Sequence, residues 1–319
     1  MRPSLRSRLA LAVVLATIAP LASAGIHLPL PWKEGMRVNY LGKSVQEDQR
    51  AGKTRRIETR ETNVLRITEA GPEGFVQTWR TSDSKVTVSG DAAGLDNDRK
   101  LALALAKRFE KVSMEAVLDP QGNFTGLRNW KALGAAMREV MLPALLAQNR
   151  DKAQAAGVDE AALRERLKPV LAKMTDERAL SSTLGRQAAV FNFFTGAQLT
   201  PGKPVSYTDV VPSPWNADLI PTTGSFELRE VGPNRVTIAW KQSIDGDKAR
   251  EVMRKIGREL AGKGADGKPR PAPKLTLTDE ATVVMDRRSG LPLRIEQTRR
   301  IGAGDSRKTT VWTLEKLPD

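Results

Sequence analysis

Two short stretches of the sequence match the spacing of known functional motifs. Gly262–Gly267 reads G-x-G-x-x-G, the dinucleotide fingerprint, which works where a strand leads into a helix that receives the pyrophosphate. Here it follows a predicted helix and leads into Pro269 and Pro271, so we interpret it as a loop. Ser82–Lys85 reads S-x-x-K, but the S-D-N and K-T-G elements of penicillin-recognising enzymes are missing. It lies between two predicted strands and is interpreted as a surface turn.

Several other chemistries are excluded because their residue types are missing. The 319 residues include no cysteine, which excludes disulfides, thiolate metal sites and thiol nucleophiles. His27 is the only histidine, which excludes a zinc site built from several histidines. A Ser-His-Asp triad is not expected either. Asp91, Asp96 and Asp98 lack the strict alternation and the terminal glutamate of a calcium loop. We therefore predict no metal, no cofactor and no identifiable catalytic residue.

Carboxylate chemistry is the exception, because it needs only two acidic side chains at the right distance. The chain has 37 acidic residues, and nothing in the sequence selects a pair among them. A carboxylate-dependent hydrolase is accordingly kept as a third functional hypothesis.

Methionine and phenylalanine are concentrated in a segment with helical spacing. These side chains adapt to irregular apolar ligands, and they serve an ordinary core equally well. Both interpretations stay open at this stage. The candidate ligand-binding residues are Met137, Met141, Met174, Phe191, Phe193 and Phe194.

The elements that position these residues begin with a β-rich part over residues 25–128. Its strands mix charged residues and threonine with apolar residues, which favours an antiparallel sheet with one face in water. Leu101, Leu105 and Phe109 are spaced as on an amphipathic helix over 96–111, with an alternating strand over 101–106 as the alternative. Asp119–Asn123 has proline and glycine where a type I turn favours them, which predicts a β-hairpin.

A helical insertion is predicted over residues 129–200. Apolar residues recur at helical spacing from Trp130 to Leu145 and again from Val158 to Met174. Pro169 lies inside the second segment and is expected to kink or divide it. A third helix is expected to begin at Thr175-Asp-Glu, with a cap and an acidic first turn.

Residues 201–319 are predicted to return to strands. They are punctuated by turns at Gly232–Asn234 and Asp286–Gly290, a helix over Lys248–Gly262 and a flexible loop over Gly262–Pro273. Runs of strands separated from runs of helices indicate an α+β fold. We predict a curved, half-barrel-like antiparallel sheet with the helical insertion packed against it, residues 25–319 forming one structural domain.

The first 24 residues have the composition of a cleaved signal peptide. Arg2, Arg6 and Arg8 precede the apolar run Leu9–Ala19, and Ala22-Ser-Ala24 supplies the small residues that a signal peptidase reads. The run is too short for a membrane span, and no later segment approaches the required length. We expect a chain that begins at Gly25, has no transmembrane segment, and is periplasmic or secreted.

The chain is strongly basic, with a net charge of +14, of which residues 1–24 contribute three positive charges and no negative one. A periplasmic address argues against nucleic acid as the partner. Lipid head groups, lipoproteins or other anionic envelope components would complement a charge of this sign. The alternative interpretation is ordinary solvated surface charge.

The order of elements resembles that of the LolA-like periplasmic lipoprotein carriers. The resemblance rests on the signal peptide, the strand-rich ends, the hairpin at Leu118–Phe124 and the final strands around Asp286–Gly290. It implies a curled antiparallel sheet whose concave side is covered by helices. The resemblance covers only the order of the elements, so no functional residue is carried over. The chain is longer than such carriers, mainly through residues 129–200.

Two main functional hypotheses follow. In the first, the protein binds or carries an apolar or amphiphilic envelope molecule non-covalently beneath the helical insertion. In the second, it is an envelope interaction or structural protein with a basic surface and no ligand cavity. They differ in whether the helices shelter apolar surface beyond the needs of packing.

Overall fold

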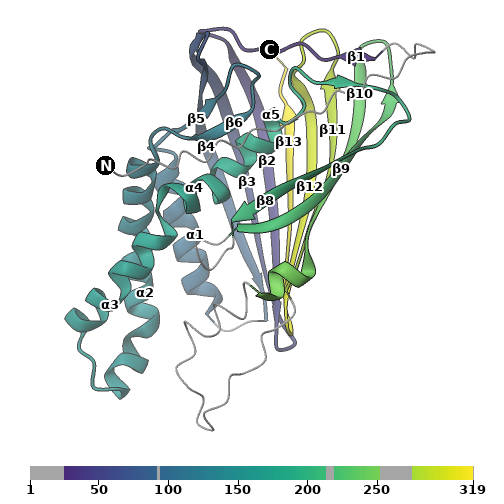
Figure 1. Ribbon diagram of the computed structural model, residues 1–319. Coiled ribbons are helices and arrows are strands. Elements are labelled where there is room, and N and C mark those ends of the chain that lie inside the picture. The colour runs from purple at the N-terminus through teal and green to yellow at the C-terminus, as the bar shows by residue number, and fades with distance from the viewer. Residues whose placement is uncertain (1–24, 92–93, 213–218, 252–274, 319) are drawn as a thin grey trace, which may run out of the picture.

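The computed structural model describes residues 25–91, 94–212, 219–251 and 275–318. They form an α+β fold built on one large antiparallel sheet (Figure 1), which confirms the predicted fold class. The predicted signal peptide, residues 1–24, lies outside this part of the chain. Among the described residues, every helix is too short or too polar to span a lipid bilayer.

Both β-rich parts of the chain contribute to the same 11-stranded sheet, in the order β6-β5-β4-β3-β2-β13-β12-β11-β10-β9-β8. The strands are β2 (Arg37–Arg50), β3 (Lys53–Gly71), β4 (Gly74–Gly90), β5 (Met114–Leu118), β6 (Phe124–Leu127), β8 (Val205–Pro212), β9 (Leu219–Val231), β10 (Arg235–Ile244), β11 (Leu275–Asp286), β12 (Pro292–Ala303) and β13 (Ser306–Lys316). The first and last long strands, β2 and β13, pair at the centre of the sheet. A separate pair joins β1 (Ile26–His27) to β7 (Gln198–Leu199).

The predicted insertion contains four helices, and it leaves the sheet at one edge strand, β6, and returns at the other, β8. They are α2 (Trp130–Ala155), α3 (Glu160–Met174), α4 (Glu177–Thr183) and α5 (Gly185–Asn192). α3 and α4 begin at aspartate caps, Asp159 and Asp176, whose carboxylates accept backbone N–H groups three residues on. The predicted capped helix after Thr175 is thereby confirmed.

Pro169 does not divide its helix, so that part of the prediction was wrong. α3 runs through it from Glu160 to Met174. Proline removes one helical N–H donor, and the carbonyl of Glu165, four residues earlier, loses its partner. Both residues lie on an exposed side of α3, where water can bond that carbonyl.

The surface turn predicted at Ser82–Lys85 was wrong, because these residues lie within β4, where the irregularity is a β-bulge with Asp83 at a φ of +55°. Other local predictions agree with the structure. α1 (Leu95–Phe109) confirms the helix over 96–111 and shows the alternative strand to be wrong. The hairpin turn closes with a hydrogen bond of 2.9 Å from the Gly122 N–H to the Asp119 carbonyl, and Gly122 has a φ of +86° that favours glycine. Residues 246–251 are helical, whereas the rest of the helix predicted over 248–262 and the loop at 262–273 lie outside the described residues.

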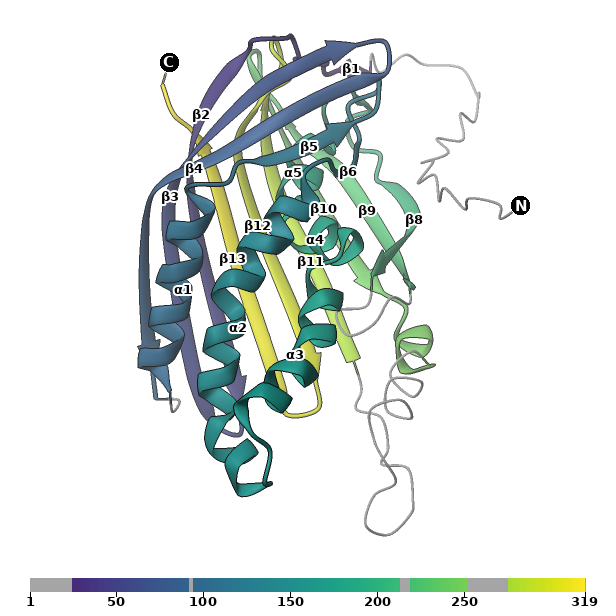
Figure 2. The same ribbon diagram turned by 90° about the vertical axis from the view of Figure 1, so that its left-hand side faces the viewer.

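The sheet curls around α5, with α1, α2 and α3 on the same side (Figure 2). α4 contacts β6 and β8, the two edge strands of the sheet. α5 approaches β6 so closely that a Cβ at Gly185 would lie 2.5 Å from the Phe124 ring. At the end of α5, the Phe193 ring packs edge-to-face against Phe226 of β9, with 6.1 Å between the ring centroids. Short helices therefore bridge the two edge strands, which have nine strands between them in the sheet, and we call the side that the helices occupy the inner face.

A candidate site on the inner face of the sheet

The inner face divides into two halves along the strands. The apolar half contains Val38, Leu65, Ile238, Val283, Ile295 and Leu314, all buried in the main core. The polar half contains Gln46, Asp48, Arg55, Gln242, Asp279, Gln297, Arg299, Lys308 and Thr310. Strand register, with side chains alternating between the two faces, keeps each set on one side of the sheet.

α5 seals the apolar half with the phenylalanines that the sequence singled out. Phe191 is 1% exposed, and its ring lies 5.9 Å from Trp32, 5.3 Å from Tyr40 and 4.9 Å from Trp79, measured between centroids. Edge-to-face aromatic contacts of this kind add to the apolar area that is buried. Phe191 thus has the surroundings of a core residue.

Phe193 and Phe194 form a second aromatic group toward the far edge of the sheet. Phe193 lies 5.7 Å from Tyr207 and 5.9 Å from Trp240, again between ring centroids. The indole N–H of Trp240 donates a hydrogen bond of 2.5 Å to the Tyr207 hydroxyl. Burial raises the pKa of Tyr207 to about 12.

The three methionines are not gathered at the phenylalanines. Met137 packs beside Leu133 and Leu180, in a small cluster between α2, α4 and β6. Met141 is partly buried on α2, and Met174 is 44% exposed at the end of α3. The structure therefore separates the six candidates into a buried aromatic group and three dispersed methionines, and their ligand-binding role stays a prediction.

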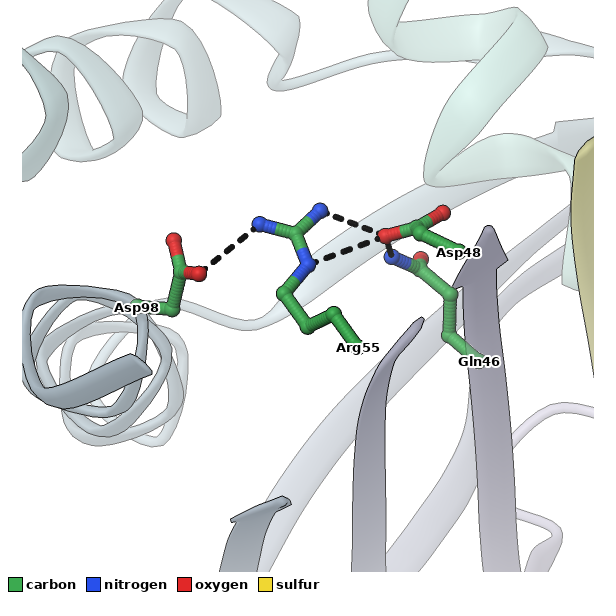
Figure 3. Close-up of polar contacts among 4 residues, drawn as sticks. All are labelled: Gln46, Asp48, Arg55 and Asp98. Atoms are coloured by element: carbon green, nitrogen blue, oxygen red, sulfur yellow. Dashed lines mark hydrogen bonds and ion pairs between the residues drawn. The ribbon is translucent and has the colours of Figure 1, made fainter. Parts of the chain in front are cut away.

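In the polar half, Arg55 of β3 joins the sheet to α1 (Figure 3). Its Nε donates to Asp48 Oδ2 at 3.1 Å, its Nη2 also contacts that oxygen, and its Nη1 lies 3.0 Å from Asp98 Oδ2 on α1. Gln46 donates a further hydrogen bond of 2.9 Å to Asp48. Burial opposes the charge of Arg55, but the hydrogen bonds to the two aspartates outweigh it and raise its pKa.

Asp279 of β11 is a fully buried charge at the centre of this half. Its Oδ1 lies 2.6 Å from Nη2 of Arg186 on α5 and accepts a hydrogen bond of 3.3 Å from Gln297. The other carboxylate oxygen, Asp279 Oδ2, has no hydrogen bond with any residue that the structure describes. Buried polar groups are normally hydrogen-bonded, so this oxygen is a feature that the fold alone does not satisfy.

Two further cations, Arg299 of β12 and Lys308 of β13, are partly buried in the polar half. Neither makes an ion pair or a side-chain hydrogen bond with any residue that the structure describes. Burial lowers the pKa of Arg299 to about 10, with a smaller contribution from the charge of Arg186. Burial likewise lowers the pKa of Lys308. Asp279 lies across the strands from Arg299, and Asp48 from Lys308, and the charges of these carboxylates partly oppose the two shifts. Desolvated cations that lack an ion pair cost stability, which is typical of functional sites.

Sequence reasoning missed the four residues at this centre: Arg186, Asp279, Arg299 and Lys308. A local signal existed for Arg299, because Ile295, Gln297, Arg299 and Ile301 alternate along one strand and place a cation on the apolar side. The other three become neighbours only through strand pairing and the position of α5. Local patterns do not report such contacts.

The outer face of the sheet holds a groove of about 470 Å³ over β9 to β12. Its acidic side chains are paired: Glu280 contacts Arg300 at 2.8 Å and Glu296 contacts Arg294 at 3.0 Å, both measured between nitrogen and oxygen. These pairs are exposed to water, where ion pairs contribute little. The groove is an ordinary hydrated sheet surface, and the candidate site is the inner polar half.

Comparison with known proteins identifies no family. No protein-family model and no curated protein sequence matches the chain. Among solved structures, it is similar to lipovitellin, in a structure that describes lipid–protein interactions, with 8% identity and a TM-score of 0.42 over 90% of this chain and 25% of that one. It also matches an outer membrane channel from Pseudomonas putida F1, with 6% identity and a TM-score of 0.23 over 90% and 97% of the chains. The chain thus spans a quarter of lipovitellin, and membership of the lipoprotein-carrier superfamily stays a hypothesis.

Proposed function

We propose that the protein binds an amphiphilic molecule of the cell envelope non-covalently at the inner face of its sheet. The observation that carries the proposal is the polar half of that face, where partly buried cations have no ion pair with any residue that the structure describes. The apolar half is filled by α5 and has the packing of a core. Binding is therefore assigned to the polar half and to the helices on the same side of the sheet.

The apolar part of such a ligand has candidate contacts on α3. Val170 is 51% exposed and Met174 is 44% exposed, and residues four apart lie on one face of a helix. α3 lies on the inner side of the sheet (Figure 2). Exposed apolar side chains on the same side of the sheet as its charged half would suit a molecule with a tail and a polar head.

The expected periplasmic or secreted location agrees with the binding of an amphiphile. Residues 1–24 are expected to direct export, and amphiphiles need a carrier or a receptor to cross an aqueous compartment. The second hypothesis, an interaction protein with a basic surface, has less support because many outer-face arginines already contact glutamates, among them Arg56, Arg229, Arg294 and Arg300.

Native mass spectrometry of the protein purified from a bacterial periplasm, followed by lipid extraction, tests the proposal. We expect a bound amphiphile, and uptake of a fluorescent fatty acid by the emptied protein. Val170→Ser with Met174→Ser should weaken that uptake about tenfold, while Lys173→Ser on the same helix should not. A ligand-free mass together with no uptake by the wild-type chain would favour the interaction hypothesis instead.

A further inference from the structure

We infer that the polar half of the inner face binds the anionic group of its ligand, a phosphate or a carboxylate, through Arg299 and Lys308. This inference rests on the proposed function and names the head-group chemistry of the same site. It follows from strand register, burial and the pairing of the surrounding charges.

Register places the two cations side by side. Arg299 pairs with Thr310, and Ile301 pairs with Lys308, so the two cations are diagonal neighbours on β12 and β13. Diagonal neighbours on one face of an antiparallel pair lie about 7–8 Å apart at their backbones, within reach of long side chains. One anionic group could therefore contact both.

The neighbouring acids are already committed to other cations. Asp48 is held by Arg55, and Asp279 is held by Arg186. Asp98 also contacts Arg55, and Asp209 of β8, a further partly buried carboxylate on this face, hydrogen-bonds with Gln242. Arg299 and Lys308 therefore remain without an ion pair in the part of the chain that the structure describes.

The donors of this pair suit an anion better than any other group. A guanidinium offers five N–H donors and an ammonium three, and neither can accept a hydrogen bond. Charge-assisted bonds to phosphate or carboxylate are the strong ones, above all where water is partly excluded. A neutral head group would leave both cations unpaired, and a cationic one would be repelled.

The test compares three probes on the full chain by isothermal titration calorimetry. Dodecyl phosphate carries both tail and charge, dodecyl maltoside carries only the tail, and inorganic phosphate carries only the charge. The two detergents are used below their critical micelle concentrations. We expect dodecyl phosphate to bind the wild-type protein at least tenfold more tightly than either other probe.

The decisive variant is Arg299→Gln with Lys308→Gln, which keeps polar side chains of similar size. It should lose the tenfold preference for dodecyl phosphate over dodecyl maltoside. The matched control, Arg294→Gln with Arg307→Gln, removes two cations from the outer face of the same two strands and should keep it. The melting temperature is measured alongside, because removal of the two cations ends their burial cost and also their attraction to Asp279 and Asp48 across the strands.

The outcomes separate the two proposals. Equal binding of both detergents, unchanged in the decisive variant, would overturn the anion inference and leave the proposed function intact. Phosphate binding as strong as that of dodecyl phosphate would keep the anion site and overturn the amphiphile. A lower melting temperature in the decisive variant, with the probe preference unchanged, would assign the two cations a structural role and overturn the inference.

Discussion

The two halves of the inner face are built by the same strands and yet have opposite energetics. On β12, Ile295 is buried in the core, and four residues later Arg299 occupies the same face among charges. On β11, Val283 and Asp279 repeat the contrast, and both are almost fully buried. Each strand therefore packs into the apolar core at one end and presents polar side chains at the other.

This difference teaches where stability and function are located. Burial of the apolar half supplies the hydrophobic free energy that a fold requires. The polar half desolvates charges and leaves some of them without partners, which costs free energy. A region that costs stability in a fold that is otherwise consistent is the expected place for function.

The largest effect should come from the centre of the apolar half. Phe191→Ala removes a fully buried ring from contact with Trp32, Tyr40 and Trp79, and should lower the free energy of unfolding by about 3–5 kcal/mol. Urea denaturation followed by circular dichroism measures it. Met174→Ala serves as the control and should change stability by less than about 0.5 kcal/mol, because its side chain is exposed. Equal effects of the two substitutions would contradict the division of the inner face.

A smaller loss is expected at the single polar pair within the apolar half. Gln77 and Asn192 exchange two amide hydrogen bonds of 2.9 Å, and Asn192 also donates to the Ala188 carbonyl at 2.8 Å. Asn192→Ala leaves the buried Gln77 Nε2 without its partner, although Gln77 Oε1 still accepts from Trp79 Nε1 at 3.3 Å, and should cost about 1–3 kcal/mol. The double variant Gln77→Leu with Asn192→Leu should be less harmful than the single one in thermal melts, because it leaves no orphaned amide and loses in addition only the long Trp79 hydrogen bond. If the double variant is the more damaged, the pair contributes chiefly through its shape.

Local sequence patterns predicted most of the elements, because each depends on residues close together in the chain. Leu101, Leu105 and Phe109 were sufficient for α1, and Asp119–Asn123 was sufficient for the hairpin turn. The α+β class followed from the order of these elements. Two local predictions failed: Pro169, where exposure of the helix let α3 continue, and the turn at Ser82–Lys85, where the strand β4 accommodates a bulge instead of ending.

The candidate site was beyond such patterns, because it is made by register. Nothing near Lys308 in the sequence indicates that Arg299 is its neighbour, or that β2 pairs with β13 at the sheet centre. The sequence singled out the phenylalanines because they lie close together along the chain. The structure places them in the core or packed against it. Met174 is apolar like them, but it is 44% exposed at the end of α3.

The boundary between the halves can be tested through pH. Burial raises the pKa of Glu61, with Glu110 adding to the rise. The protonated form is therefore favoured by folding, and its stabilisation is fully present below pH 4 and is lost as pH rises through the folded-state pKa. Glu61→Gln mimics the protonated form, so it should match the wild-type protein at pH 4 and be the more stable at pH 7 in urea melts.

Glu58 provides the matched control, since it lies three residues away on the outer face. Hydrogen bonding to Arg56 lowers its pKa, so its stabilisation is present at neutral pH and is lost on acidification. Glu58→Gln should therefore be slightly destabilising at pH 7 and neutral at low pH, the opposite sign to Glu61→Gln. The same sign for both variants would remove the distinction between the two faces.

The smallest effect is expected where the polar half joins α1. This helix has no buried residue, and Asp98 in its first turn contacts Arg55 of the sheet at 3.0 Å. Asp98→Asn should cost less than about 1 kcal/mol, because the pair is partly exposed and Arg55 keeps Asp48. Hydrogen exchange should nevertheless quicken in α1 and not in the central strands.

Asp96→Asn removes the same charge from the same turn, but its partner, Arg99, belongs to α1 itself. The two variants therefore lose the same interaction with the helix dipole, and only the first loses the link to the sheet. Equal exchange in both would mean that the ion pair does not hold α1 against the polar half.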